Sequence, residues 1–131
     1  MDEPKPGFDL EERLLDFAAA IVRFTESMHR TPAGLHVAGQ LLRSGTSPMP
    51  NHGEAQAAES AADFVHKMSI CLKELRETRR WLRLVHRVPL VRSPATADPL
   101  IQETEELIKI FYRSITTAKK RALRKGGEGE R

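Results

Sequence analysis

The sequence of 131 residues has one cysteine, few aromatic residues and no long apolar run. Cys71 alone cannot form an intrachain disulfide, so a disulfide-stabilised secreted scaffold is excluded and the cytoplasm is the expected compartment. Uncharged runs are far shorter than the ~20 apolar residues that a membrane span requires. The acidic start, Met1 to Pro4, lacks the basic and apolar regions of a signal peptide. We therefore expect no membrane association. The low aromatic content, 5%, is typical of a helical core built from Leu, Ile, Val and Ala.

Catalytic and metal-binding signatures are also lacking. There is no glycine-rich phosphate loop, no HExxH and no CxxC. His52 with Glu54 and His66 is the only grouping that resembles a metal site, and Glu54 and Glu59 do not form the Glu-x-x-His pattern of di-iron bundles. Cys71 is expected to be a small buried residue. The sequence predicts a protein that is not an enzyme and binds no metal or cofactor; a metal-dependent bundle enzyme is the weakest alternative.

Apolar residues recur at helical spacing in three long stretches. The steps are mostly three and four residues, as in the buried face of a bundle helix. The three sets are Leu10, Leu14, Phe17, Ile21, Phe24 and Met28; Phe64, Met68, Leu72, Leu75 and Leu82; and Ile101, Thr104, Ile108, Phe111, Ile115, Ala118 and Ala122. In the second of these stretches, Trp81, Val85 and Val88 lie on a different side of the helix and suggest a further buried contact.

Capping residues and prolines mark where these helices begin and end. Asp9 can cap the first helix, and Pro32 fits the first turn of the next one. Pro89 ends the helix that starts near residue 60. Asp98 followed by Pro99 is a strong start signal for the last helix.

A further helix is predicted from Pro32, with an irregular middle. Its core-facing residues are expected to be Leu35, Ala38, Leu41 and Leu42, while Arg43 could reach solvent. Pro48 and Pro50 each remove a backbone donor, so we expect the helix to be kinked or broken near residues 47–50. A short helical piece resumes at Asn51.

These segments define an all-α fold. Short connections favour antiparallel neighbours, so we predict an up-down-up-down four-helix bundle over residues 9–125. Residues 1–8 and the polar stretch 126–131 are predicted to be disordered.

Charge is distributed unevenly along the chain. Residues 1–66 hold 5 Lys or Arg against 10 Asp or Glu, whereas residues 67–131 hold 16 against 8. A basic second half suggests an acidic partner, either nucleic acid or another protein.

The most distinctive basic feature is what we call the arginine stripe. Five of its cations follow helical steps of three and four on one face about 20 Å long, and the sixth lies at the margin. Guanidinium groups suit phosphate because they donate two parallel hydrogen bonds and keep their charge. The alternative is a solvated face whose cations pair with Glu74, Glu77 or acids of the first helix. The arginine stripe comprises Lys73, Arg76, Arg79, Arg80, Arg83 and Arg87.

A second basic group, the C-terminal cluster, comprises Lys119, Lys120, Arg121, Arg124 and Lys125. It is a second candidate nucleic-acid surface, although cations at a helix C-terminus also complement the helix dipole. In an up-down-up-down bundle this cluster and Arg87 lie at opposite ends. The two groups could then combine into one surface only across subunits of an oligomer.

The densest set of motifs lies in residues 40–82. It reads Ser44-Gly45-Thr46-Ser47, then Asn51, Glu54 and Ala55, then Ala62-Asp63-Phe64, then Glu77-Thr78 and Trp81-Leu82. Over about residues 10–122 the chain resembles a family of small bacterial four-helix bundle proteins, which includes proteins encoded in 23S rRNA intervening sequences. More distant members are the accessory variability determinants of diversity-generating retroelements.

The resemblance implies a four-helix bundle assembled into a ring-shaped homopentamer. In the retroelement branch it further implies a basic surface that binds nucleic acid and a reverse transcriptase. It suggests that the family-motif residues organise the kinked helix rather than form a catalytic pair; these are Ser44, Thr46, Asn51, Glu54, Asp63, Phe64 and Trp81.

Two functions follow as expectations. The first is a homo-oligomeric bundle that binds structured RNA or single-stranded DNA through arginine–phosphate contacts, as an accessory to a reverse transcriptase in the retroelement case. The alternative is a protein-interaction scaffold without nucleic-acid binding, in which the arginines pair with acidic residues across a subunit interface.

Overall fold

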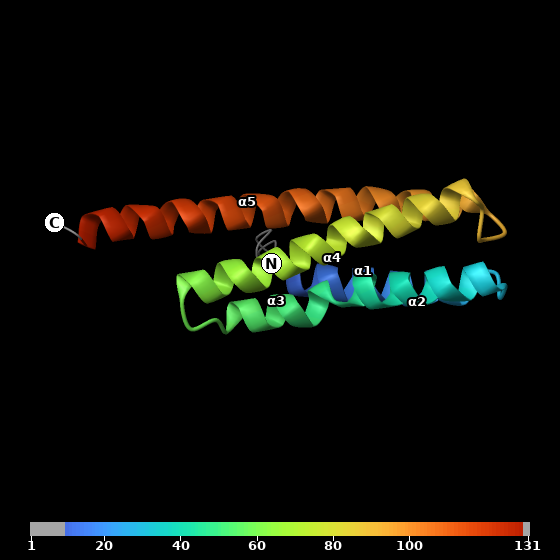
Figure 1. The fold of residues 1–131 in the computed structure, drawn as a ribbon, viewed down its shortest axis with the longest axis horizontal. Coiled ribbons are helices and arrows are strands. Elements are labelled where there is room, and N and C mark those ends of the chain that lie inside the picture. The colour runs from blue at the N-terminus through green and yellow to red at the C-terminus, as the bar shows by residue number, and fades with distance from the viewer. Residues whose placement is uncertain (1–9, 130–131) are drawn as a thin grey trace, which may run out of the picture.

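A computed structural model describes residues 10–129, with side chains up to Gly126 (Figure 1). The 1–8 segment and the predicted cap at Asp9 lie outside the described residues. The helices are α1 (Leu10–Glu26), α2 (Pro32–Thr46), α3 (Pro48–Gln56), α4 (Ala61–Arg87) and α5 (Asp98–Gly129), with a short 3-10 helix η1 (Pro94–Ala97) before α5.

The predicted up-down-up-down bundle is confirmed. α2 and α3 together form the second helix of the bundle, and successive helices run antiparallel (Figure 1). α4 is central, since it packs against α2, α3 and α5, while α1 lies mainly against α2 and α3. Residues 10–129 contain no β-strand, and the only extended pairing among them is one isolated bridge between Met28 and Val91.

The predicted kink is a bend in the helix at one residue, Ser47. Ser47 separates α2 from α3 while keeping helical dihedral angles (φ −64°, ψ −39°). Pro48 and Pro50 lack the amide hydrogens that would continue the helix ladder at this point. The Asn51 side-chain amide donates to the Ser47 carbonyl (3.0 Å) and to its hydroxyl (2.9 Å). The helix therefore changes direction without opening into a loop.

The core follows the predicted apolar sets, with corrections. All six residues of the first set are buried, and Val37, Leu41 and Leu107 also join the core. Leu35 and Leu42, predicted to face the core, are instead 55% and 40% exposed, and Val88 is 52% exposed. Leu35 and Leu42 sit on the outer side of α2 because Ser44 and Gly45, rather than Leu42, face α1 and α4.

The two ends of the bundle differ. At one end the connections pack together, with the His29 amide donating to the Leu90 carbonyl (2.9 Å). At the other end α5 continues past the start of α4 (Figure 1). Residues 126–129, predicted to be in a disordered tail, are helical.

Candidate nucleic-acid interface

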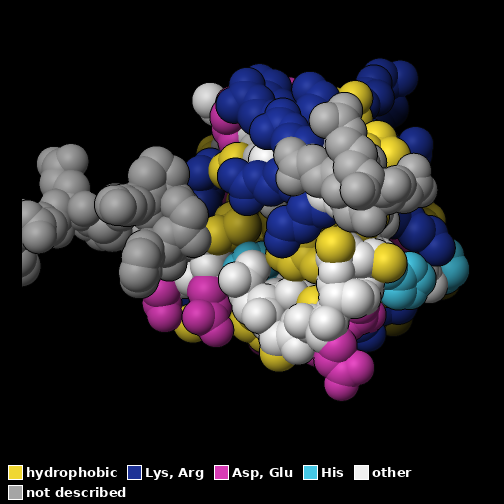
Figure 2. All heavy atoms as spheres, turned by 90° about the vertical axis from the view of Figure 1, so that its left-hand side faces the viewer, with side chains coloured by type: hydrophobic (Ala, Val, Ile, Leu, Met, Phe, Trp, Pro, Cys, Tyr) yellow, Lys and Arg dark blue, Asp and Glu magenta, His cyan; other side chains and the backbone are white. Residues whose placement is uncertain are grey.

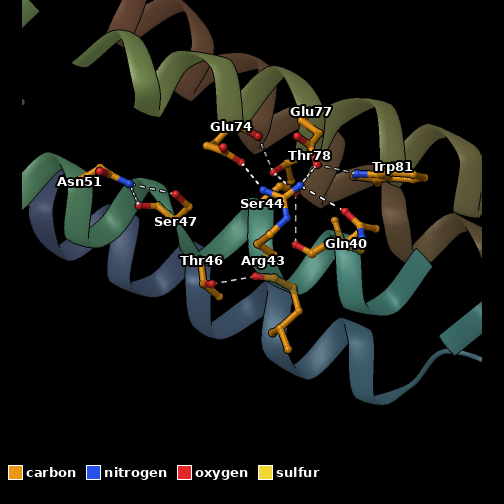
Figure 3. Close-up of polar contacts among 12 residues, drawn as sticks. Gln40, Arg43, Ser44, Thr46, Ser47, Asn51, Glu74, Glu77, Thr78 and Trp81 are labelled. Atoms are coloured by element: carbon orange, nitrogen blue, oxygen red, sulfur yellow. Dashed lines mark hydrogen bonds and ion pairs between the residues drawn. The ribbon is translucent and has the colours of Figure 1, made fainter. Parts of the chain in front are cut away.

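The motif residues of α2 and α4 form one polar network across the helix pair (Figure 3). Arg43 pairs with Glu74 (3.0 Å) and with Glu77, and also donates to Gln40 (3.3 Å). The Trp81 indole donates to the same Glu77 carboxylate (3.0 Å). Glu74 and Glu77 are only 14% and 28% exposed, so their charges are largely sheltered and held by Arg43. We call Gln40, Arg43, Ser44, Glu74, Glu77, Thr78 and Trp81 the motif network.

Small motif residues let the helices approach closely. Ser44 is fully buried, and its hydroxyl oxygen lies 2.9 Å from that of Thr78 on α4. A Cβ at Gly45 would lie 2.8 Å from Cγ2 of Ile21 on α1. Residues 44 and 45 thus place α2 tightly between α1 and α4.

The other family-motif residues make local contacts. The Thr46 hydroxyl donates to the Leu42 carbonyl (2.7 Å), and Asn51 bonds Ser47 at the bend. Glu54 accepts from Lys67 of α4 (3.1 Å). Asp63 lies in the first turn of α4, where its amide bonds the Ser60 hydroxyl that caps the helix (3.0 Å). Each of these contacts shapes the second helix or its seam with α4.

The motif network binds the two acids of α4 that lie nearest in sequence to the arginine stripe. In the alternative interpretation of the stripe as a solvated face, Glu74 and Glu77 were its partners, but both are bound by Arg43. Among the described side chains, no stripe residue forms an ion pair or a side-chain hydrogen bond. The ion pairs of that alternative, with α4 acids or with acids of the first helix, are therefore not formed among the described side chains.

The stripe lies on the outward face of α4. Five of its six side chains are exposed and Arg79 is half-buried. Arg80, Arg83 and Arg87 surround a shallow groove of about 260 Å³ over Leu84. Like charges three and four residues apart destabilise a helix by about 0.2–0.5 kcal/mol per pair. We therefore expect the stripe to lower the stability of the isolated chain.

The C-terminal cluster lies at the opposite end of the molecule, as the bundle topology predicts. Its five side chains are exposed on the last turns of α5, and they form no ion pair with any side chain described between residues 10 and 126. Figure 2 shows this end, with Lys and Arg side chains gathered on the side of α5 and apolar side chains visible beneath them. The stripe and the cluster do not form one patch on the monomer.

Arg43 was missed as a structural residue. We expected it to reach solvent, and its side chain is half-exposed, yet it holds two carboxylates. The available signal was the position of Arg43 beside the Ser44 motif, together with two glutamates three residues apart on α4. A similar link, Arg13 to Glu103 (2.7 and 2.8 Å), joins α1 to α5, and this hydrogen bonding raises the pKa of Arg13.

The buried titratable groups show no catalytic arrangement. Cys71 is fully buried, and burial raises the pKa of its thiol to about 12, so it is not a thiolate at neutral pH. His52 is 5% exposed, and burial lowers its pKa. Its Nε2 lies 3.2 Å from Gln56 Nε2, whereas Nδ1 finds no partner among the described atoms.

The described residues hold neither a metal-binding cluster nor a membrane-spanning helix. No three His, Cys, Asp or Glu side chains within residues 10–126 are grouped so that they could hold a metal ion. None of the helices described has an apolar stretch long enough to cross a bilayer.

The fold and the motif network define a class: an all-α bundle in which polar and small residues hold a bent second helix against a long basic helix. The chain belongs to the 23S rRNA-intervening sequence protein family, whose model matches residues 9–113. A solved structure from Bacteroides thetaiotaomicron, described as a protein of unknown function from the S23 ribosomal protein family, is 32% identical. The match covers 80% of this chain and 96% of that one, with a TM-score of 0.74. The search of curated proteins gave no match.

Proposed function

We propose that this protein is a non-enzymatic, homo-oligomeric bundle that binds nucleic acid through the arginine stripe. Arg76, Arg80, Arg83 and Arg87 make the main phosphate contacts. The C-terminal cluster adds a second basic surface that oligomerisation brings next to a stripe. Binding depends strongly on salt and weakly on sequence, because phosphate contacts release counterions without reading bases.

The observation that carries this proposal is the pairing pattern on α4. Glu74 and Glu77, the acids in the middle of α4, form ion pairs with Arg43. The six cations of the arginine stripe form no ion pair with any described side chain. A helix that needed these cations only for solubility would gain stability from interspersed acids. A surface that receives a polyanion needs its cations unpaired.

Self-association is supported by exposed apolar side chains on the outer face of α1 and α2. Leu15, Val22, Leu35 and Leu42 are 37–55% exposed. The resemblance to ring-forming relatives suggests five subunits. For the retroelement branch it also suggests a reverse transcriptase partner, which a gene for that enzyme beside the protein's own gene would support.

The alternative is a scaffold in which the stripe pairs with acids of a neighbouring subunit. It is favoured by the uneven charge of the chain, since Glu11, Glu12, Asp16 and Glu26 are exposed on α1 or at its end. In that case the stripe holds subunits together and does not bind nucleic acid.

Light scattering on nuclease-treated protein distinguishes nucleic-acid binding from the scaffold function. The mass is measured at low and high salt, with and without a short structured RNA. The proposal expects an oligomer whose mass is independent of salt and which takes up RNA only at low salt. An oligomer that ignores RNA and dissociates in high salt would overturn it in favour of the scaffold.

A further inference from the structure

A groove at the open end of the bundle combines an apolar floor with a basic wall. Its lining residues come from the first turn of α4 and the last turns of α5. At this end of the bundle α5 extends past the start of α4 (Figure 1). The groove has a volume of about 510 Å³, within the range of small-molecule sites. Its floor is formed by Phe64 and alanines, and its wall by cations of the C-terminal cluster: Arg121, Arg124 and Lys125.

Small side chains keep this groove open. Deeper in the α4–α5 seam, Leu107, Phe111 and Leu75 fill the space and are fully buried. At the open end, by contrast, alanines at 61, 118 and 122 leave room above the Phe64 ring. Phe64 packs against the core, yet it also lines the groove.

The charges of the wall select an anion. Arg121, Arg124 and Lys125 are exposed, and none forms an ion pair with a side chain in the described part of the chain. The ligand that fits is therefore flat and apolar on one side and anionic on the other. An unpaired nucleotide has this character, since its base can stack on an aromatic ring while its phosphates meet arginine.

We propose that this groove binds an unpaired nucleotide of a single strand, with the base against Phe64 and the flanking phosphates at Arg121, Arg124 and Lys125. The inference rests on the proposed function and adds to it a preference for unpaired strands over duplexes. A duplex keeps its base faces stacked inside, so it can use only the phosphate contacts. The stripe differs, because the side chains around its own groove are Arg80, Arg83, Leu84 and Arg87, with no aromatic ring.

The test compares two DNA ten-mers of equal charge by fluorescence anisotropy at low salt. One is oligo-dT and the other has abasic residues throughout, so only the first can stack. The wild-type protein is expected to bind oligo-dT at least about fivefold more tightly. Phe64→Leu keeps an apolar side chain but removes the aromatic face, and should bring both affinities to the same value.

A second variant covers the case in which Phe64→Leu does not fold. Ala122→Leu is made at an exposed position and fills the groove without changing charge. It should also abolish the preference for oligo-dT while leaving the affinity for the abasic strand unchanged. The matched control is Arg80→Gln with Arg83→Gln, which should weaken both strands equally and retain the preference.

The outcomes separate this inference from the function on which it rests. If the wild-type protein binds neither strand and also fails to bind the structured RNA, the proposed function itself is wrong; if it binds only the RNA, the nucleotide site is wrong and the function stands. If it binds both equally, or if Ala122→Leu retains the preference, the nucleotide site is wrong and the function stands. If Ala122→Leu instead lowers the oligomer mass in light scattering, the groove holds a second copy of the chain, which also contradicts the nucleotide site.

Discussion

Gly45 sets how closely α2 can approach α1. A Cβ at this position would lie 2.8 and 2.9 Å from two Ile21 carbons, and the Ile21 side chain is fully buried. We expect Gly45→Ala to reduce the free energy of unfolding by about 1–3 kcal/mol, as overpacking of a tight seam does. Urea unfolding measures this.

Gly39 provides the matched control on the same helix. A Cβ there would meet nothing within 4 Å, so only backbone entropy changes. Gly39→Ala should stabilise the protein by about 0.5–1 kcal/mol. If Gly45→Ala also raises the free energy of unfolding, the close approach of α2 to α1 does not depend on glycine at this position.

His52 should make the fold sensitive to acid. Burial lowers its pKa from the ordinary value of 6.5, with a small opposing effect of Glu11. The folded protein therefore binds a proton less readily than the unfolded chain does, and stability falls as the pH drops below about 6.5. We expect a lower urea midpoint at pH 5 than at pH 7.5, and a smaller decrease in His52→Gln.

The exposed His66 is the control for this prediction. His66→Gln should show the same decrease between pH 7.5 and pH 5 as the wild-type protein. An equal decrease in His52→Gln would show that other groups cause the acid sensitivity.

At the level of helices, Arg43 holds α2 to α4. Its removal leaves Glu74 and Glu77 close together, mostly sheltered and without a cation. We expect Arg43→Ala to lower the free energy of unfolding by about 1–2 kcal/mol, more than the loss of a typical surface ion pair does. Trp81 is the only tryptophan and bonds Glu77, so its emission should change with the same substitution.

A double-mutant cycle checks whether the network is the cause. Combining Arg43→Ala with Glu77→Gln should cost less than the two single losses added together, because the second change relieves the unpaired charge. Strict additivity would mean that Arg43 and Glu77 do not interact.

The arginine stripe should cost stability rather than supply it. Its cations lie three and four residues apart without partners among the described side chains. Arg80→Gln with Arg83→Gln removes several like-charge contacts, so the melting temperature should rise by a few degrees at low salt. A fall in melting temperature would show that these arginines hold the structure or the oligomer together.

Across the whole molecule, the spacing of apolar residues and the positions of helix-breaking prolines predicted the architecture well. Proline positions located the bend at Ser47 and the start of α5, and the first apolar set is buried as expected. Individual side chains were harder to place, because two helix faces can look equally apolar. Leu42 was expected in the core but is exposed, and Ser44 is buried at the helix contact, since a tight helix approach favours a small side chain over a large one.

Pairing between charges was the least predictable feature. Glu74 and Glu77 lie on the same helix as the stripe, and local spacing alone favours local pairs. Their actual partner, Arg43, is more than thirty residues away and is set by how α2 packs on α4. This long-range contact leaves the stripe unpaired and so underlies the proposed function.

The most direct test of that function is the salt dependence of nucleic-acid affinity for charge-reversed variants. Arg80→Glu with Arg83→Glu is compared with Arg23→Glu and Arg30→Glu, which make the same change in net charge at exposed residues near the end of α1. We expect the stripe variant to bind a labelled RNA at least about tenfold more weakly, with a salt slope smaller by about two, while the control stays near wild type. Equal affinities for the two folded variants would contradict the assignment of the stripe as the nucleic-acid surface.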